Sequence, residues 1–315
     1  MKELVRECRR QKHLRMYSQA PFHLRFFILF VTSFTLNMPN ITWSLNHNSL
    51  IHRRSMFEGV VATGLLSPTV QTSPLLVVTD PKTYSALYYA PPQIASTTTP
   101  PPPLILVLHG AGLNNLDIRS DLADPQGEHA GLIPSLIASG GAPPELLTNF
   151  AVLAPYSQGK TSFYEDSRTK MLDFLDWAVS SSPQISFDPN KIFLFGFSDG
   201  ATVAVELMTT RRFIGGVICS YGFSGKTLPS KAIERLKDLP MWVFHSKDDV
   251  IFDVVNSDRL VSQAKTVSPF IRYSRYDQDP ENLPKRVRGH SMGITASKMP
   301  QVYDWMRQIV DTPTL

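Results

Sequence analysis

Lys191-Ile-Phe-Leu-Phe-Gly-Phe-Ser-Asp-Gly-Ala201 carries a short apolar run into the turn Gly196-Phe-Ser-Asp-Gly200, and a segment of helical pattern follows. A serine at the centre of such a turn takes a strained backbone conformation, and small residues two positions to either side let strand and helix pack closely. The turn lifts the hydroxyl out of the sheet and towards a helix N-terminus, where backbone amides and the helix dipole favour developing negative charge. The pattern predicts that Ser198 is a nucleophile, against the alternative of a chance match in a loop.

Apolar runs like the one before Ser198 recur along the chain and alternate with segments of helical length. We expect strands at Leu75–Thr79, Tyr84–Tyr89, Leu104–Leu108, Phe150–Ala154, Lys191–Phe195, Gly216–Ser220, Met241–Phe244 and Phe270–Tyr273. We expect helices over roughly 128–139, 167–180, 199–211, 229–237, 256–266 and 299–310. This alternation is typical of an α/β fold, a doubly wound, mostly parallel sheet with helices on both faces. Ligands of such sheets bind at the carboxyl ends of the strands, so the residues after each run are candidate site residues.

Two histidines follow Ser198 in the chain, His245 and His290. A serine hydroxyl is a weak nucleophile until a base takes its proton, and an acid must orient that base. His290 lies on a loop after the last expected strand of the sheet, and we interpret it as the base, against the alternative of a solvated loop histidine. His245 directly follows a strand, and we interpret it as a structural residue that positions the acid loop.

The acid that orients the base has three candidates in the loop after the penultimate expected strand: Asp248, Asp249 and Asp253. A carboxylate in this role must reach the imidazole, hold its tautomer and stabilise the imidazolium. Asp277 and Asp279 lie close to His290 in the same loop, which disfavours them. The residues alone leave the choice among the three candidates open.

Leu108-His-Gly-Ala-Gly112 ends another of the apolar runs and is a candidate oxyanion loop. An oxyanion hole needs two backbone amides, one from the residue after the nucleophile and one from a loop after an earlier strand. We expect these to be the amides of Asp199 and Ala111, with Gly112 as the alternative to Ala111. The glycines permit close approach of the backbone to a substrate carbonyl. His109 is interpreted as a structural residue that braces the loop.

Residues 1–36 differ in composition from the rest of the chain. Seven Lys and Arg stand against two Glu in residues 1–25, whereas the net charge of the whole chain is only +4, so the remainder is near neutral. The basicity belongs to this leader, and we expect no nucleic-acid partner. The apolar run Phe26–Leu36 is too short to span a bilayer, which needs about 20 residues. It fits the core of a signal peptide, and a disordered or transit-like extension is the alternative.

The domain organisation follows from these patterns. We expect residues 1–36 to be a basic leader with an apolar core, residues 37–74 a linker or loosely packed arm, and residues 75–315 the catalytic domain. If the leader is used, we expect the secretory pathway or an organelle, with membrane contact through the leader alone. If it is not used, we expect the cytoplasm. Cys8 and Cys219 make no disulfide framework and have no metal-ligand spacing, and the chain lacks a dinucleotide fingerprint. We expect no cofactor and no metal, and no feature indicates an oligomeric state.

Five segments, in this order along the chain, resemble the α/β-hydrolase superfamily. They are Leu108–Gly112, Asp188-Pro-Asn-Lys-Ile192, Gly196–Gly200, Phe244-His-Ser-Lys-Asp-Asp249 and Gly289-His290. The resemblance covers about residues 75–310. It is nearest to the phospholipase/carboxylesterase-like, dienelactone-hydrolase-like and prolyl-oligopeptidase-like esterases.

The resemblance implies roles for the candidate residues. Members of the superfamily place the nucleophile, the acid and the histidine in that chain order, which supports His290 as the base. In these relatives a His-Gly-x-x-Asp segment supplies the acid, which implies Asp249 rather than Asp248. The chain departs from the pattern at Ser246, where Gly is usual, and at Ala201, where carboxylesterase-like members tend to have a second Gly. Both departures weaken the assignment to one subfamily and leave the catalytic groups intact.

The function implied is that of a serine hydrolase cleaving a small-molecule carboxylic ester through an acyl-enzyme. The implied fold is an α/β-hydrolase fold without a large cap domain, because no segment is long enough to form a large lid. The alternatives are a peptidase or thioesterase on the same scaffold, and a non-catalytic binding scaffold. An intact set of serine, acid and histidine in the right order disfavours the scaffold, since binding needs none of the three.

Overall fold

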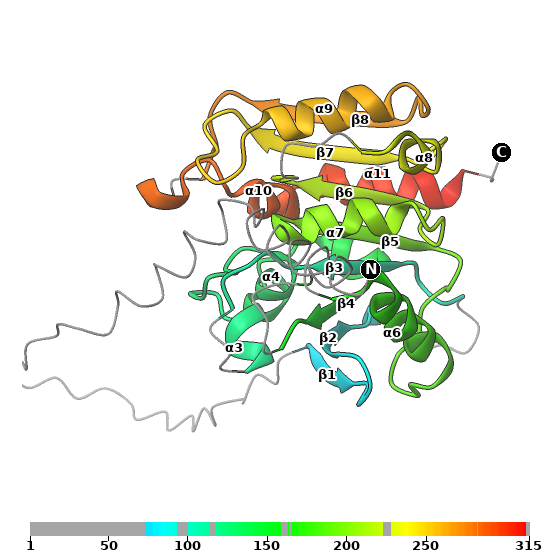
Figure 1. The fold of residues 1–315 in the computed structure, drawn as a ribbon. Helices are drawn as coiled ribbons and strands as arrows, with labels where there is room; N and C mark the ends of the chain where they lie inside the picture. Colours follow the sequence, from blue (N-terminus) through cyan, green and yellow to red (C-terminus); the bar gives the residue numbers. More distant parts are fainter. Residues whose placement is uncertain are drawn as a thin grey trace, which may run out of the picture. The chain divides into compact units, whose positions relative to one another are not determined.

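The computed structural model describes residues 74–92, 100–113, 117–158, 163, 166–222, 228–281 and 283–312. The expected leader, 1–36, and the expected arm, 37–74, lie outside the described residues except for Pro74. An eight-stranded sheet forms the centre of the described part, in the order β1-β2-β4-β3-β5-β6-β7-β8 (Figure 1). Its strands are β1 (Leu76–Thr79), β2 (Ser85–Tyr89), β3 (Leu104–Leu108), β4 (Ala151–Tyr156), β5 (Ile192–Phe197), β6 (Gly215–Cys219), β7 (Met241–Ser246) and β8 (Ile271–Tyr276).

The direction of the strands divides the sheet into two parts. β1 pairs with β2, and β2 with β4, in antiparallel register. All remaining pairs, from β4 through β3, β5, β6 and β7 to β8, are parallel. The carboxyl ends of six strands therefore meet at one edge of the sheet, as the sequence predicts for a ligand site.

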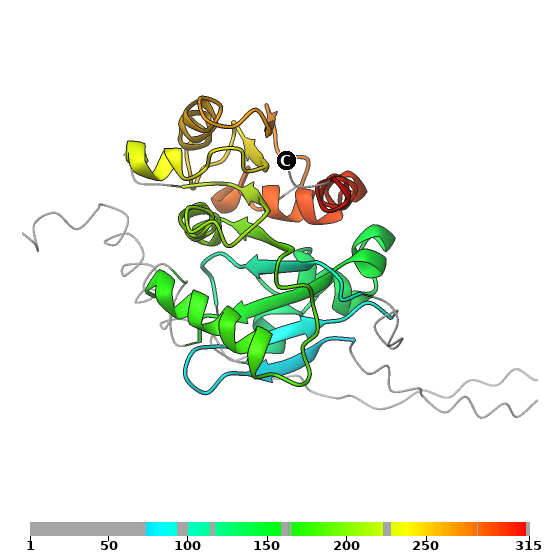
Figure 2. The ribbon, with the colours of Figure 1, turned by 90° about the vertical axis from the view of Figure 1, so that its right-hand side faces the viewer.

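Helices cover both faces of the sheet (Figure 2). One face carries α6 (Arg168–Ser180), α7 (Asp199–Met208), α8 (Ser230–Glu234) and α9 (Val255–Ala264). The other carries α3 (Ile118–Leu122), α4 (Ile133–Ser139), α5 (Pro144–Asn149), α10 (Met292–Lys298) and α11 (Pro300–Asp311). Alternate residues of one strand serve the two cores, since Leu106 packs with the first set and Ile105 with the second. Among the described helices, none has the combination of length and hydropathy that a membrane span requires.

The predicted α/β architecture is confirmed, with differences at some helices. All eight expected strands are present, and their ends differ from the expected ones by at most three residues. The helix expected over 128–139 begins only at Ile133, because Gly131 has a left-handed backbone with φ of 81°. Sequence reasoning missed the short helices α3, α5 and α10. α10 has a weak helical signal because its buried face carries the small residues Gly293, Thr295 and Ser297.

The turn between β5 and α7 brings three segments of backbone into close contact. A Cβ on Gly200 would lie 2.2 Å from the carbonyl oxygen of Leu108, at the end of β3. A Cβ on Gly196 would lie 2.6 Å from the carbonyl oxygen of Gly200. Both distances are too short for any side chain, so the two glycines are required for the strand and helix to approach this closely.

We expect Gly200→Ala to lower the free energy of unfolding by about 2 kcal/mol or more, because the added methyl group meets backbone atoms that cannot yield. Gly141→Ala is the matched control, since its Cβ would meet only side-chain atoms, none closer than 3.6 Å. The control should change the free energy of unfolding by less than about 0.5 kcal/mol. Denaturant unfolding of the full chain measures both, and equal stabilities would contradict the packing described here.

Candidate active site

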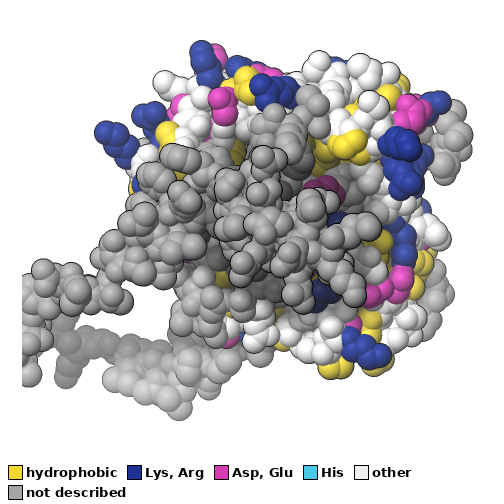
Figure 3. Space-filling model, in the orientation of Figure 1, with side chains coloured by type: hydrophobic (Ala, Val, Ile, Leu, Met, Phe, Trp, Pro, Cys, Tyr) yellow, Lys and Arg dark blue, Asp and Glu magenta, His cyan; other side chains and the backbone are white. Residues whose placement is uncertain are grey.

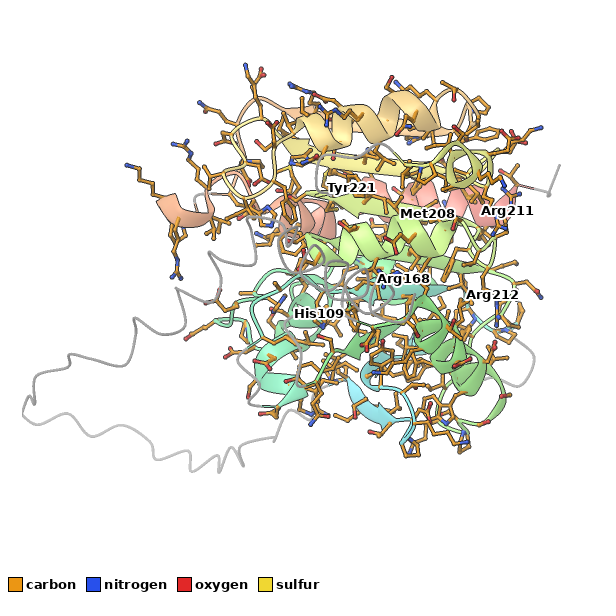
Figure 4. The ribbon with its side chains drawn as sticks, viewed as in Figure 1. His109, Arg168, Met208, Arg211, Arg212 and Tyr221 are labelled. Atoms are coloured by element: carbon orange, nitrogen blue, oxygen red, sulfur yellow. The ribbon has the colours of Figure 1, made fainter. Side chains whose placement is uncertain are left out.

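The candidate residues lie where β3, β5, β7 and β8 end, at the carboxyl edge of the parallel strands. Figure 4 shows His109 and Tyr221 towards this edge, whereas Arg211 and Arg212, which precede β6, lie at the opposite edge. Ser198 follows β5 directly and is the N-cap of α7, with φ of 56° and ψ of −123°. This left-handed conformation is rare for a residue with a side chain and costs of order 1–3 kcal/mol. The Ser198 N–H donates to the carbonyl oxygen of Cys219 at 3.0 Å, which fixes the turn to the neighbouring strand.

Ser198, His290 and Asp249 form one continuous chain of hydrogen bonds. Ser198 Oγ lies 2.8 Å from His290 Nε2, and His290 Nδ1 lies 2.7 Å from Asp249 Oδ2. An ionised carboxylate can only accept, so Nδ1 carries a proton and Nε2 has the lone pair that accepts from the serine hydroxyl. All three residues are buried, with 9% or less of each exposed. The geometry is that of a base within reach of a nucleophile and oriented by an acid.

The loop that carries His290 is fixed from two sides. Gly289 has φ of 77°, and a Cβ there would lie 2.3 Å from the carbonyl carbon of Asp248, so the two loops touch through backbone alone. Asp279 accepts from both the backbone N–H and the hydroxyl of Ser291, the residue after His290. The backbone contact at Gly289 and the hydrogen bonds between Ser291 and Asp279 therefore fix the chain on both sides of His290.

Asp249 is held by four donors. Its Oδ1 accepts from the backbone N–H groups of Ile251 at 2.8 Å and Phe252 at 2.9 Å. Its Oδ2 faces His290 Nδ1 at 2.7 Å and His245 Nε2 at 3.3 Å. Burial alone would raise the pKa of this carboxyl, but the hydrogen bonds from His245 and His290 outweigh it and hold the pKa at about 2. The carboxylate is ionised at neutral pH.

The other candidate acids have different partners. Asp248 accepts from the Ser246 hydroxyl at 2.5 Å and from the Asp279 backbone N–H at 3.1 Å, so it ties the loop after β7 to the loop after β8. Asp253 accepts from the Val255 backbone N–H at 2.9 Å at the start of α9. The structure thus brings Asp249, and neither Asp248 nor Asp253, to the imidazole.

The loop after β3 packs directly on the serine turn. A Cβ on Gly110 would lie 3.0 Å from Ser198 Cβ. Ala111 follows, and no described atom accepts a hydrogen bond from its N–H, while Gly112 has φ of 102°. Asp199 opens α7 immediately after the serine. Asp199 is thus the chain neighbour of Ser198, and Ala111 is the chain neighbour of Gly110, which packs against Ser198. Their predicted role as oxyanion donors stays a prediction.

His109 lies buried beneath this loop. Its Nε2 accepts from the Ser157 backbone N–H at 3.3 Å, so the proton is on Nδ1, which donates to the carbonyl oxygen of Gly110 at 2.6 Å. Burial and the neighbouring His129 lower the pKa of His109 to about 3. His109 is therefore a neutral brace for the loop, in agreement with the structural role expected for it.

No group of three or more His, Cys, Asp or Glu side chains in the described residues could hold a metal ion. On the face seen in Figure 3, the described basic and acidic side chains are interspersed over the surface. Within the described residues, Ser198, His290 and Asp249 form a buried hydrogen-bonded set.

Comparison with known proteins identifies relatives of this fold. A thermostable esterase superposes with a TM-score of 0.53 at 20% identity, over 74% of this chain and 62% of that esterase, so the chain spans less than two thirds of its length. An α/β hydrolase from a Medee basin deep-sea metagenome library gives 0.48 at 15% identity, over 76% of this chain and 100% of the other. A thermostable esterase from Pseudomonas putida gives 0.45 at 16% identity, over 75% and 82%. At these identities the likeness concerns the fold.

The family is identified by sequence. No curated protein matches the chain. The sequence model of the phospholipase/carboxylesterase family, however, matches residues 90–286, which is more than half of the chain and includes Ser198 and Asp249. The chain belongs to the phospholipase/carboxylesterase family of α/β hydrolases.

Proposed function

We propose that this protein is a serine hydrolase that cleaves carboxylic esters through an acyl-enzyme, with Ser198 as nucleophile, His290 as base and Asp249 as the orienting acid. The observation that carries the proposal is the buried hydrogen-bonded chain from Ser198 Oγ through His290 to Asp249, at 2.8 Å and 2.7 Å. Membership of an esterase family supports the choice of bond.

In the proposed reaction, His290 Nε2 takes the proton of Ser198 as the serine oxygen attacks the carbonyl carbon of the ester. The N–H groups of Ala111 and Asp199 stabilise the oxyanion, and each such donor contributes about 3 kcal/mol in comparable sites. The tetrahedral intermediate then collapses, and His290 gives the proton to the leaving alcohol. A water molecule, deprotonated by His290, hydrolyses the acyl-enzyme and restores the serine. Asp249 stays ionised throughout and stabilises the imidazolium.

Peptidase and thioesterase activities are the second candidate, because a serine activated by the same histidine and aspartate can also attack amides and thioesters. The leaving group separates them. Initial rates on a p-nitrophenyl ester, a thioester and an anilide with the same short acyl group compare the three bonds directly. The proposed function predicts the highest kcat/KM on the oxygen ester.

We expect Ser198→Ala to abolish both hydrolysis of a short p-nitrophenyl ester and labelling by a fluorophosphonate, because the attacking oxygen is removed. Asp249→Asn should lower kcat by about 10³-fold or more, since an amide cannot hold the imidazole in the required tautomer. Asp248→Asn is the matched control and should keep kcat within about tenfold of the wild type, since Asp248 does not touch His290.

Labelling that survives in Ser198→Ala would overturn the nucleophile, and equal losses in the two aspartate variants would overturn the acid. A wild type that folds, yet neither hydrolyses the ester nor reacts with the fluorophosphonate, would indicate a non-catalytic scaffold.

The ionisation of Asp249 also predicts a pH dependence of stability. Its pKa is about 2 in the folded chain against an ordinary value of 3.8, so the ionised form stabilises the folded state above pH 4 and this contribution is lost as the pH falls to 2. We expect the free energy of unfolding of the wild type to fall between pH 4 and pH 2 by about 2 kcal/mol more than that of Asp249→Asn. Denaturant unfolding across this range measures the difference, and parallel curves would contradict an ionised, hydrogen-bonded Asp249.

A further inference from the structure

A second imidazole stands beside the acid. His245 is the fifth residue of β7, and its side chain has no exposed surface. Its Nε2 lies 2.9 Å from the carbonyl oxygen of Phe252 and 3.3 Å from Asp249 Oδ2. Its Nδ1 lies 2.7 Å from the hydroxyl of Ser257 on α9. The ring thus connects the strand, the acid and the helix that follows the acid loop.

These contacts fix where the ring carries a proton. A backbone carbonyl and an ionised carboxylate both only accept hydrogen bonds, so Nε2 of His245 must be protonated to face Phe252 and Asp249. The N–H donates to the Phe252 carbonyl oxygen at 2.9 Å and lies next to Asp249 Oδ2 at the longer distance of 3.3 Å. Ser257 lies on the other side of the ring, where its hydroxyl can donate a hydrogen bond to the lone pair of Nδ1.

We infer that His245 is a positioning residue for the acid. Its Nε2–H holds Asp249 Oδ2 in place and partly compensates the negative charge of that carboxylate, so Asp249 stabilises a protonated His290 less strongly. The inference rests on the proposed function for its effect on turnover. Asp249 Oδ2 then has two imidazole donors, His290 on the side of the nucleophile and His245 on the side of the core, while Oδ1 is occupied by two backbone N–H groups.

Other charged or titratable groups of the described residues lie on the elements around the pair. On α9, the carboxylate of Asp258 is bound by the Tyr273 hydroxyl at 2.7 Å and by Arg275 Nε at 3.0 Å, both from β8. On β6, Cys219 is buried, which raises the pKa of its thiol and keeps it neutral. The loop after β8 contributes His290 itself, whose ring lies against the uncharged ring of Phe252. Asp248 is turned to Ser246, to the backbone of Asp279 and to Arg288, whose Nε lies 3.7 Å from Asp248 Oδ2.

The consequence for the reaction has a direction. Without the His245 N–H, the negative charge on Asp249 is less compensated. Asp249 then stabilises the protonated form of His290 more strongly. The acidic limb of the kcat/KM profile should then move to higher pH. At the same time the acid loses one of its anchors, and a base displaced by a fraction of an ångström lowers kcat. Substrate binding is untouched because His245 is fully buried, so KM should not change.

The test compares His245→Asn with His245→Gln on a p-nitrophenyl ester, using the full chain. The Gln amide can place an N–H where Nε2 is, whereas the shorter Asn amide ends near the position of Nδ1. We expect Asn to lower kcat by about tenfold or more with little change in KM. The midpoint of its acidic limb should rise by about half a pH unit. Gln should restore both quantities to near the wild-type values.

Ser257→Ala is the control for a purely structural role, since it removes only the contact at Nδ1. It should lower the thermal unfolding temperature and leave the acidic limb where it is. An Asn variant with the wild-type profile, or one that behaves like Ser257→Ala, would overturn the inference. A wild type without esterase activity would instead refute the proposed function.

A second measurement is independent of activity and of the Asn variant's folding. The ¹⁵N spectrum of histidine-labelled full-length wild type reports which ring nitrogen carries the proton, and the signal missing from His245→Gln belongs to His245. We expect a protonated Nε2. An unprotonated Nε2 would exclude the hydrogen bond to Asp249 and overturn the inference.

Discussion

Ser198 holds a backbone conformation that residues with side chains avoid, at a cost of order 1–3 kcal/mol, and the close packing around it keeps it there. The turn fits only because Gly196 and Gly200 let β5, α7 and the end of β3 come within backbone contact of one another. The same contact brings the loop after β3 against the serine, where Gly110 leaves room for Ser198 Cβ. One local constraint therefore sets the position of the hydroxyl, the start of α7 and the candidate oxyanion loop together.

Asp249 and His290 reach this hydroxyl from two other strand ends, and hydrogen bonds tie their loops to each other. Asp248 accepts a hydrogen bond from the backbone N–H of Asp279, and Asp279 accepts one from the backbone N–H of Ser291, the residue after His290. Asp248, the alternative to Asp249 as the candidate acid, therefore joins the two loops in the structure. Removing the charge of Asp248 loosens that junction, whereas removing the charge of Asp249 alters the imidazole directly.

The sequence predicted those parts of the fold and site that depend on local patterns. Runs rich in apolar residues indicated the eight strands of the described sheet, and the glycines around Ser198 indicated the turn, because both patterns reflect sterics within a few residues. The acid could not be chosen from the residues alone, since Asp248 and Asp249 are neighbours and only long-range contacts with His290 and Asp279 separate them. The resemblance to esterases selected Asp249, and the geometry places it at the imidazole. The helix α10 escaped prediction because its small buried residues are dictated by tertiary packing.

In the proposed reaction, the strained turn presents Ser198 as the group that is acylated. Peptide mapping by mass spectrometry, on full-length protein quenched in acid within the first turnover of p-nitrophenyl acetate, tests this directly. We expect one acetyl group per chain, located on Ser198. Acetyl groups on another serine, or scattered over surface lysines with Ser198 unmodified, would contradict it.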